Sequence, residues 1–400
     1  MYSKKRTAQY TIINMAYFAA YSGVHAYAAV FLLDRGFSNT MIGIILALAN
    51  ILSVLMQPVT AGWIDKYEKF TNRKVSIVSA FGCLLACIVL YFAKGTAVIF
   101  ITYVLLYMLQ MVYQPLIQAL NFEYNSMGDR INFGLARGLG SCGFALTSSL
   151  IGKLLVLNGV SVLQIINVIM FIIGILMMFI FTAPKPDNIN KEEVLNAEDN
   201  ITDAVEETAH NSFISFVKCY PMFMLFVLGG TLLFFEHNAL NDYLIQIITP
   251  LGGNETTMGN MVMVAAFLEL PAMAGFASIE KKIGTKKILM FSGIMFSVKT
   301  ILMLVANNIF LAYLSQACQI FAYALFIPGG AYLAEKVMSK ADKTKGQAYI
   351  NCCITLGGVF SALVCGRLLD VMGTHSMLLI AAIIGIIGTM ISIVAIRKMD

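Results

Sequence analysis

Residues 184–211 read PKPDNINKEEVLNAEDNITDAVEETAHN, with eight carboxylates against two lysines. No other long polar segment occurs in this chain, in which 59% of the residues are hydrophobic and 12% are charged. Such a segment cannot bury enough apolar surface to fold alone, so we expect it to be an acidic linker. It separates two parts of similar length, residues 1–183 and residues 212–400.

Both parts consist of long apolar runs. The mean hydropathy is +0.79, and runs of about 20 residues with few charges recur, which is the length that a helix needs to cross hydrocarbon. Strands are not indicated, because the runs are too long and show no period of two. The sequence therefore predicts an all-α polytopic membrane protein with twelve transmembrane helices in two six-helix halves. The spans are expected at about residues 8–33, 41–64, 75–94, 97–121, 132–157, 161–183, 213–248, 256–279, 287–306, 309–336, 345–371 and 374–397.

The basic residues lie in short clusters between the spans. Outside the linker the chain has 25 lysines and arginines against 14 acidic residues, because two of the 27 basic and eight of the 22 acidic residues lie inside it. Clusters that alternate with apolar runs indicate membrane topology and not a nucleic-acid partner. They fall at residues 4–6, 66–74, 281–287, 336–345 and 397–398. By the positive-inside rule, both termini and the linker are expected in the cytoplasm, and the protein in the cell membrane.

Several kinds of chemistry have no carrier in the sequence. The eight cysteines lack CxxC spacing and lie in or beside apolar runs, so neither a metal site nor a disulfide framework is indicated. No HExxH, GxSxG or GxxxxGK[ST] sequence occurs, so we expect no enzymatic activity, no ATP-driven pumping and no cofactor. No cleavable signal peptide is evident, because the first apolar run has spanning length.

Two connections have similar sequences at similar positions in the two parts. AGWIDKYEKFTNRK (Ala61–Lys74) follows the second span, and ASIEKKIGTKK (Ala277–Lys287) follows the eighth. Each places an acidic residue beside a basic one and then returns to basic residues. The layout of six spans, linker and six spans is typical of a two-halved secondary transporter. We expect these loops to gate a conformational change, through Asp65, Lys66, Arg73 and Lys74 in the first and Glu280 and Lys281 in the second.

Two stretches resemble a known family. Gln57-Pro58, followed by Asp65-Lys66 and Arg73-Lys74, is similar to the loop between helices two and three of the major facilitator superfamily. GLARGLGSCGFALTSSLIG (Gly134–Gly152) is similar to helix five of the lactose permease. Over almost its whole length the chain resembles the lactose permease and oligosaccharide:proton symporter branch of that superfamily.

The resemblance implies a substrate site on the fifth span. Arg137 stands at the position of the sugar-binding arginine and Phe144 at that of the sugar-stacking tryptophan. Arg137, Ser141 and Phe144 share one helical face, which suits a polyol; the alternative is that Arg137 snorkels to the interface. The permease's carboxylate partner of this arginine corresponds to an alanine, and Glu123, one turn further, is the available substitute.

Charges in the middle of the spans are the second group of candidates, because charge in hydrocarbon is expensive. Glu269 and Lys299 lie in the middle of the eighth and ninth spans, and we expect them to form an ion pair that either couples a proton or is only structural. By the resemblance, Lys299 matches the permease's helix-nine arginine. Gln319 stands in place of the helix-ten histidine and an alanine in place of its proton-carrying glutamate. Proton transfer would then fall to Glu269 or to Glu236 of the seventh span, and the coupling ion, proton or sodium, stays open.

Polar stripes on two spans complete the expected site. Amides in lipid need partners, so a continuous polar face predicts a pore or cavity. The fourth span carries Gln110, Gln114, Gln118 and Asn121 on one face, and the first carries Tyr21 and His25.

These features predict a secondary active transporter that works by alternating access. Its substrate would be a small polar organic solute, a saccharide or a nucleoside, moved together with a proton or sodium ion. The alternatives are an exporter of amphipathic drugs or metabolites and, less favoured, a membrane receptor. The expected partners are the substrate, the coupling ion and the lipid bilayer, and we expect a monomer.

Overall fold

The computed structural model describes residues 2–67, 69–128, 130–183 and 213–399. Within these ranges the regular structure is helical, without strands. The expected linker lies outside the described residues. The first part contains α1 (Lys4–Tyr21), η1 (Ser22–Ala26), α2 (Ala28–Asp34), α3 (Asn39–Lys66), α4 (Asn72–Phe92), α5 (Thr96–Ser126), α6 (Phe133–Asn158) and α7 (Val162–Ile180). The second contains α9 (Phe213–Cys219), α10 (Pro221–Asp242), α11 (Leu244–Ile248), η3 (Thr249–Leu251), α12 (Glu255–Ile283), α13 (Thr285–Leu304), α14 (Ile309–Ala317), η4 (Cys318–Ile320), α15 (Tyr323–Val337) and α16 (Lys343–Lys398).

Side-chain caps fix where several of these helices begin. Ser38 accepts a hydrogen bond from the backbone N–H of Met41 (3.3 Å) at the start of α3, and Asn254 accepts one from Thr257 (3.1 Å) at the start of α12. Each cap satisfies one of the amide groups that a helix leaves without a partner in its first turn.

The number of apolar helices agrees with the expected spans. Ten helices of the described residues are long and apolar enough to cross a membrane, and the bent pair of Lys4–Ala26 and Ala28–Asp34 makes eleven. Helix α16 has 56 residues, about 84 Å at 1.5 Å per residue, which is more than twice the ~30 Å of hydrocarbon. It breaks at Gly373, whose φ of 76° leaves the helical region. Its two arms therefore bring the number to the predicted twelve.

Two spans are interrupted at mid-length. Residues Ser22–Ala26 form a π-helix, and the span bends by 51° just after it. In the second half, the 3₁₀ turn Cys318–Ile320 separates α14 from α15. Such interruptions widen or tighten single turns and are common at functional sites.

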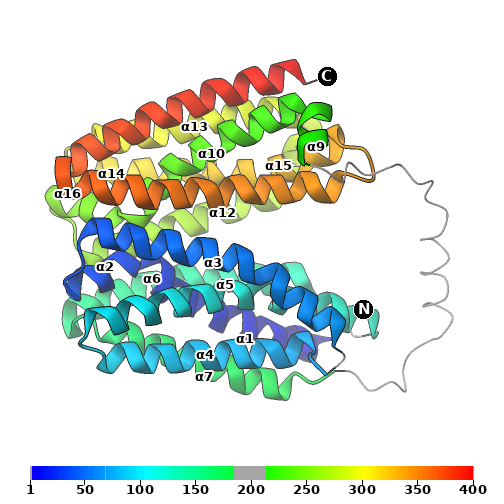
Figure 1. Ribbon diagram of the computed structural model, residues 1–400, viewed down its shortest axis with the longest axis vertical. Coiled ribbons are helices and arrows are strands. Elements are labelled where there is room, and N and C mark those ends of the chain that lie inside the picture. The colour runs from blue at the N-terminus through cyan, green and yellow to red at the C-terminus, as the bar shows by residue number, and fades with distance from the viewer. Residues whose placement is uncertain (1, 68, 129, 184–212, 400) are drawn as a thin grey trace.

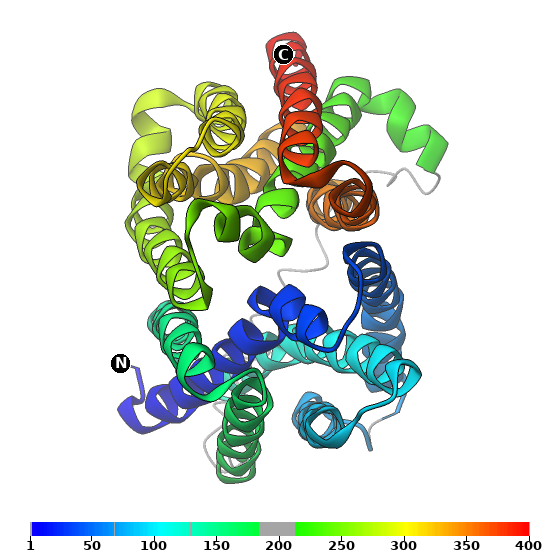
Figure 2. The ribbon, with the colours of Figure 1, turned by 90° about the vertical axis from the view of Figure 1, so that its left-hand side faces the viewer.

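The helices form two bundles, α1–α7 and α9–α16, which lie side by side (Figure 1). Viewed along the helices, the bundles face each other across a broad seam (Figure 2). Helix α6 packs against α12, and α3 packs against α16. We call the end of the bundles where α1 begins and α16 ends the basic end, because Lys4, Lys66, Lys282 and Lys398 lie there. The opposite end, with Asn39, Glu255 and Gly373, is the far end.

The described hydrogen bonds between the two halves all lie toward the far end. Asp370 accepts from Asn39 and Thr40, and the amide of Gln246 donates to Asn39 (2.9 Å). On the other side of the seam, Ser149 donates to Asn260 (2.6 Å) and Thr256 to the carbonyl of Gly152 (3.1 Å). Toward the basic end, α3 diverges from the first arm of α16 (Figure 1). The described hydrogen bonds therefore hold the halves together at the far end.

Glycines allow the closest approach at this closed end. A Cβ atom at Gly43 would lie 2.0 Å from the carbonyl oxygen of Ala362, and one at Gly366 would lie 2.4 Å from that of Asn39. Across the seam between α6 and α12, a Cβ atom at Gly259 would lie 2.4 Å from the carbonyl oxygen of Ser148. Backbone therefore packs directly on backbone where α3 meets α16 and where α6 meets α12.

Candidate functional site

Arg137 lies near the basic end of α6, where its guanidinium group is half-buried. Its Nη1 donates to the hydroxyl of Ser141 (2.8 Å), and its guanidinium carbon lies 4.1 Å from the centre of the Phe18 ring. Ser141 is one turn deeper, so the side chain reaches into the bundle and does not snorkel toward the end of the helix. The planar group is held in place by a hydrogen bond and an aromatic face, which leaves its other N–H groups for a ligand.

The rings of Tyr21, His25 and Tyr107 pack together in the first half, next to the Phe18 ring that Arg137 contacts. The rings of Tyr21 and His25 stack with centroids 3.8 Å apart, and Tyr107 lies 3.9 Å from His25 on its other side. The hydroxyl of Tyr107 donates to Asn50 (3.3 Å), and Phe144 packs beside Tyr21 with ring centroids 6.2 Å apart. His25 belongs to the π-helix, and the two rings clamp it at the bend of the first span.

Unsatisfied polar atoms accompany these rings. Both ring nitrogens of His25 and both amide atoms of Gln110 are buried, and apart from the contact between these two side chains neither group has a hydrogen-bond partner among the described residues. Native proteins leave few buried polar groups unpaired, so such groups indicate a bound water or ligand. Gln110 and Asn121 are buried inside the first half, whereas Gln114 and Gln118 are half-buried on the same helix.

In the second half, a chain of hydrogen bonds joins three spans. The ammonium group of Lys299, 1% exposed on α13, donates to the side-chain oxygen of Gln319 in η4. The amide nitrogen of Gln319 in turn donates to Glu269 on α12. The expected direct ion pair is therefore wrong: no described contact joins the charged atoms of Lys299 and Glu269, because Gln319 lies between them. The 3₁₀ turn carries Gln319 into this position, where its oxygen faces the cation and its N–H the carboxylate.

Glu123 does not partner Arg137 among the contacts of the described residues. Its carboxylate accepts a hydrogen bond from Asn72 (3.1 Å), which begins α4 at the basic end. The proposed substitution of Glu123 for the permease's carboxylate is therefore not what the structure shows. The reason is geometric: Glu123 lies at the end of α5, past the level at which Arg137 turns inward.

The charges of the two halves act on each other across the seam. Arg137 interacts electrostatically with Glu269 and with Tyr323, both in the second half. Asp242, at the end of α10, acts in the same way on Tyr21 and Tyr107 of the first half. The polar groups of both halves therefore face a common region, to which the first half contributes the cation Arg137 and the second half the carboxylates Glu269 and Asp242.

The two repeated loops make their described contacts inside their own halves. Arg73 donates to the carbonyls of Met178 and Phe179 (both 2.9 Å), and Lys74 donates to that of Lys69 (3.0 Å). The carboxylate of Glu280 accepts from Lys336 and from Thr285. Asp65, Lys66 and Lys281 are exposed on the basic end. The gating role expected of these residues remains a prediction.

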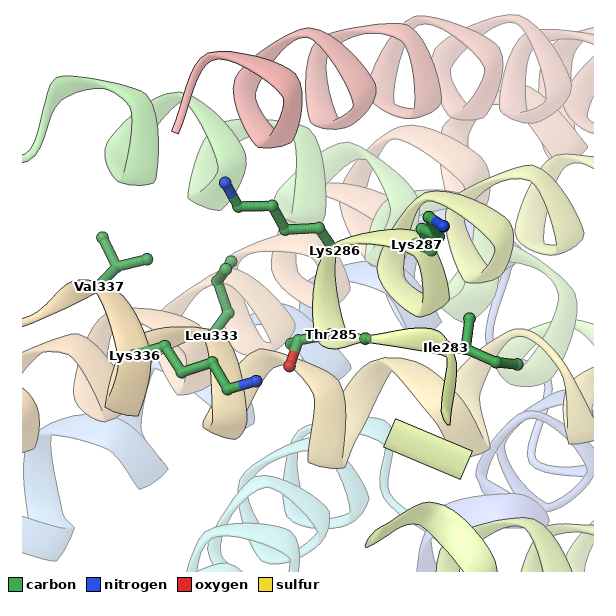
Figure 3. A pocket seen from close by; sticks show the side chains of 8 residues that line it. Ile283, Thr285, Lys286, Lys287, Leu333, Lys336 and Val337 are labelled. Atoms are coloured by element: carbon green, nitrogen blue, oxygen red, sulfur yellow. The ribbon is translucent and has the colours of Figure 1, made fainter. Parts of the chain in front are cut away.

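A cavity of about 350 Å³ lies at the basic end of the second half (Figure 3). Its lining consists of Ile283, Gly284, Thr285, Lys286, Lys287, Leu333, Lys336 and Val337. Lys336 is engaged by Glu280, and Lys286 donates to the carbonyl of Met399. This cavity contains none of the groups that face the seam, so it is separate from the candidate site.

Residues 8–380 match the MFS_1 like family. The chain belongs to this family. Because the family and the structural neighbours are membrane transporters, the MFS_1 like chain is a multi-pass membrane protein and not an enzyme. No curated protein matches the sequence at a significant level.

Solved structures show the same fold at low sequence identity. The nucleoside transporter NupG superimposes with a TM-score of 0.76 and 14% identity, over 99% of this chain and 100% of its own. A POT family transporter in complex with a thioalcohol conjugated peptide gives 0.72 and 12%, over 98% and 96%. A bacterial homolog of the human lysosomal transporter Spinster, inward-facing and unoccupied, gives 0.68 and 12%, over 99% and 98%. These matches show the transporter fold, and the narrower resemblance to the lactose permease remains a prediction.

Two residues at the seam of the MFS_1 like chain were not among the expected site residues. Asp242 faces the tyrosines of the first half, and Tyr323 stacks on His237 with ring centroids 5.0 Å apart. Asp242 lies in the polar sequence EHNALNDY, Glu236–Tyr243, which could equally be solvated at the end of a span. Only the position of α10 against η1 of the first half, beside Tyr21 and Tyr107, distinguishes the two cases.

Proposed function

We propose that the chain is a secondary transporter that moves a small polar organic solute, a nucleoside or a saccharide, together with a proton. One observation carries the proposal: Arg137 and its neighbours in one half face the Lys299–Gln319–Glu269 chain in the other, between halves whose described hydrogen bonds to each other lie toward the far end. A site at the interface of two related halves is the arrangement that alternating access requires.

The chemistry of the two faces supports this class of solute. Arg137, Ser141 and the unsatisfied atoms of His25 and Gln110 offer hydrogen bonds, and Phe144 and Tyr21 offer flat apolar surfaces. A nucleoside or sugar has both requirements, since its hydroxyls need hydrogen bonds and its ring needs a flat contact. The likeness in fold to NupG, a nucleoside transporter, supports the nucleoside as the first solute to test.

The topology follows from the basic end. Lysines and arginines gather there, and the positive-inside rule assigns such an end to the cytoplasm. On that assignment both termini are cytoplasmic, the protein lies in the cell membrane, and the far end, where the hydrogen bonds between the halves lie, faces away from the cytoplasm.

Glu269 is the proposed coupling group. Its carboxylate is held by the amide of Gln319 and lies within the field of Lys299 and of Arg137. A carboxyl group between apolar surroundings and nearby cations can gain or lose a proton when those cations move. Substrate that engages Arg137 would change this field, which links binding of solute to the charge of Glu269.

The test uses purified protein in liposomes that contain a pH-sensitive dye. Nucleosides and sugars are added outside in sodium-free buffer, with the wild type, Glu269→Gln and the control Glu335→Gln, which removes an exposed carboxylate paired with Lys343. We expect a solute-dependent pH change in the wild type and the control and its loss in Glu269→Gln.

Each other result contradicts part of the proposal. A pH change retained in Glu269→Gln rejects this residue as the coupling group. Solute uptake that needs sodium and moves no proton rejects the coupling ion. No response to any nucleoside or sugar rejects the solute class and favours export of amphipathic compounds.

A further inference from the structure

Glu236 is a carboxyl group buried in the second half, within the field of Lys299. It lies on α10 with 0% exposure, and neither of its oxygens has a hydrogen-bond partner among the described residues. The second arm of α16 leaves room for it at Gly385, where a Cβ atom would lie 1.9 Å from Oε2. The three atoms nearest to that position all belong to the Glu236 carboxyl group.

Helix α13 provides the polar groups that face this carboxyl. The Phe296 ring packs against Phe234 and His237 of α10 with centroids 5.7 and 5.6 Å apart, which brings the next turn of α13 beside Glu236. That turn carries Lys299 and Thr300, and both interact with the carboxyl. The hydroxyl of Thr300 donates to the carbonyl of Phe296 in its own helix (3.3 Å) and also lies close enough to interact with the Glu236 carboxyl, but as a neutral group it cannot balance a charge there.

The other polar side chains near Glu236 are uncharged or already take part in hydrogen bonds to other groups. On α16, Thr389 donates to the carbonyl of Gly293 (2.8 Å) and shares a hydrogen bond with Ser297 (2.9 Å). On α10, His237 is hydrogen-bonded to Asn241 (2.8 Å) and stacked on Tyr323. Lys299 is therefore the charged group that faces Glu236 from the packed helices, and Glu269 is the other carboxyl within the field of the same lysine.

Two carboxyl groups thus face one ammonium group. An isolated ion in a low-dielectric interior is far more expensive than a neutral acid or a paired charge. The arrangement of lowest charge has Lys299 positive, one carboxyl ionised and the other protonated. In this conformation Lys299 is linked through Gln319 to Glu269, which leaves the proton for Glu236.

We propose that Glu236 is a buried proton-binding site that shares one proton with Glu269, with Lys299 pairing with whichever carboxyl is ionised. When Glu269 takes up a proton from water at the seam, Lys299 turns to Glu236, whose O–H bond breaks and whose proton passes to water. The O–H bond formed at one carboxyl matches the one broken at the other. The inference deepens the proposed function, on which it rests for the use of that proton in transport.

Infrared spectroscopy of the purified, substrate-free protein tests this sharing, since protonated carboxyl groups absorb separately from carboxylates. Glu236→Gln should remove the intensity of one carboxylic acid from the wild-type band. Glu269→Gln should remove the same intensity, because Lys299 then pairs with Glu236 and ionises it. Lys299→Gln should add the intensity of one further acid, because both carboxyls then carry protons. The exposed control, Glu335→Gln, should leave the band unchanged.

Two results would overturn the proposal. A band unchanged in Glu236→Gln means that Glu236 is ionised, and a band unchanged in Glu269→Gln means that the two groups do not share a proton. Lys299→Gln/Glu236→Gln, which should return the band to the wild-type intensity, checks the assignment independently of either single variant. The infrared measurement requires no substrate. Failure to transport any of the tested solutes would therefore contradict the proposed function but not the sharing of a proton between Glu236 and Glu269.

Discussion

Asp370 joins the two halves by accepting two hydrogen bonds from Thr40, one from its backbone N–H (2.7 Å) and one from its hydroxyl (2.5 Å). Its other oxygen accepts from the backbone N–H (3.1 Å) and the side-chain amide (2.9 Å) of Asn39. A carboxylate from the first arm of α16 thus caps the first turn of α3, where the amide groups are otherwise unpaired and the helix dipole favours a negative charge.

Asp370→Ala should therefore shift the protein toward states that are open at the far end. Because the carboxylate is exposed, the effect should be modest: a charge at a helix N-terminus contributes about 0.3–1 kcal/mol, which is a shift of roughly two- to fivefold in the ratio of states. Distances between spin labels on the far ends of α3 and α16 measure the ratio. Asp34→Ala is the matched control, since Asp34 lies at the same end but pairs with Arg35 of its own half. Equal ratios in both variants would show that the cap does not hold this end closed.

Gly385→Ala should destabilise the second half through Glu236 alone. The added methyl group overlaps the carboxyl, and overpacking of a buried site costs about 1–3 kcal/mol of unfolding free energy. In a Glu236→Ala background the same change should be nearly neutral, because the carboxyl atoms that the new methyl group would meet are gone. Thermal unfolding in detergent compares the four proteins of this cycle. Equal losses in both backgrounds would mean that the methyl group meets something other than the carboxyl.

Gln319→Leu should separate Lys299 from Glu269 while keeping the volume of the side chain. Two buried charges then lose their bridge, and a buried polar group left unsatisfied costs about 1–3 kcal/mol, or more when it is charged. We expect a lower unfolding temperature and loss of solute-dependent proton movement. Gln316→Leu, on the preceding turn and 2% exposed, is the control that should keep transport. Transport retained in Gln319→Leu would show that the bridge is dispensable.

Arg137→Lys should weaken binding of the solute even though it keeps the charge. Lysine lacks the planar fork that both contacts Ser141 and lies flat on Phe18. A drop of about tenfold in affinity corresponds to ~1.4 kcal/mol, the size of one or two polar contacts. Calorimetric titration with the solute identified in liposomes measures it, with Lys153→Gln, exposed on the same helix, as control. Unchanged affinity in Arg137→Lys would remove this residue from the site.

The sequence predicts the architecture well because it depends on local properties. Span length, the break between the eleventh and twelfth spans and the placement of Arg137 and Ser141 on one helical face all follow from spacing along the chain. The family is likewise shown by comparison, since residues 8–380 match it. Such features need no knowledge of which helices are neighbours.

The site is less predictable because it joins residues from different spans. That Gln319 would bridge Lys299 and Glu269 depends on the 3₁₀ turn of η4, and that His25 is clamped by two tyrosines depends on the π-helix of η1. Neither interruption contains a proline, the usual sequence signal for a break. Glu123 was assigned to the wrong partner for the same reason. It lies one turn further along α5 than the family's carboxylate position, and at that level of the helix its neighbour is Asn72.

The glycine contacts between the two halves determine what has to be broken when the halves separate at the far end. Where Gly43 meets Ala362 and Gly259 meets Ser148, a backbone carbonyl oxygen and a tyrosine hydroxyl group, of Tyr243 or Tyr27, pack directly on the glycine. Parting the halves therefore breaks these close contacts together with the hydrogen bonds at the far end, whose polar groups water can then satisfy. A single methyl group at either glycine would overlap a backbone carbonyl oxygen and force the two helices apart at the far end.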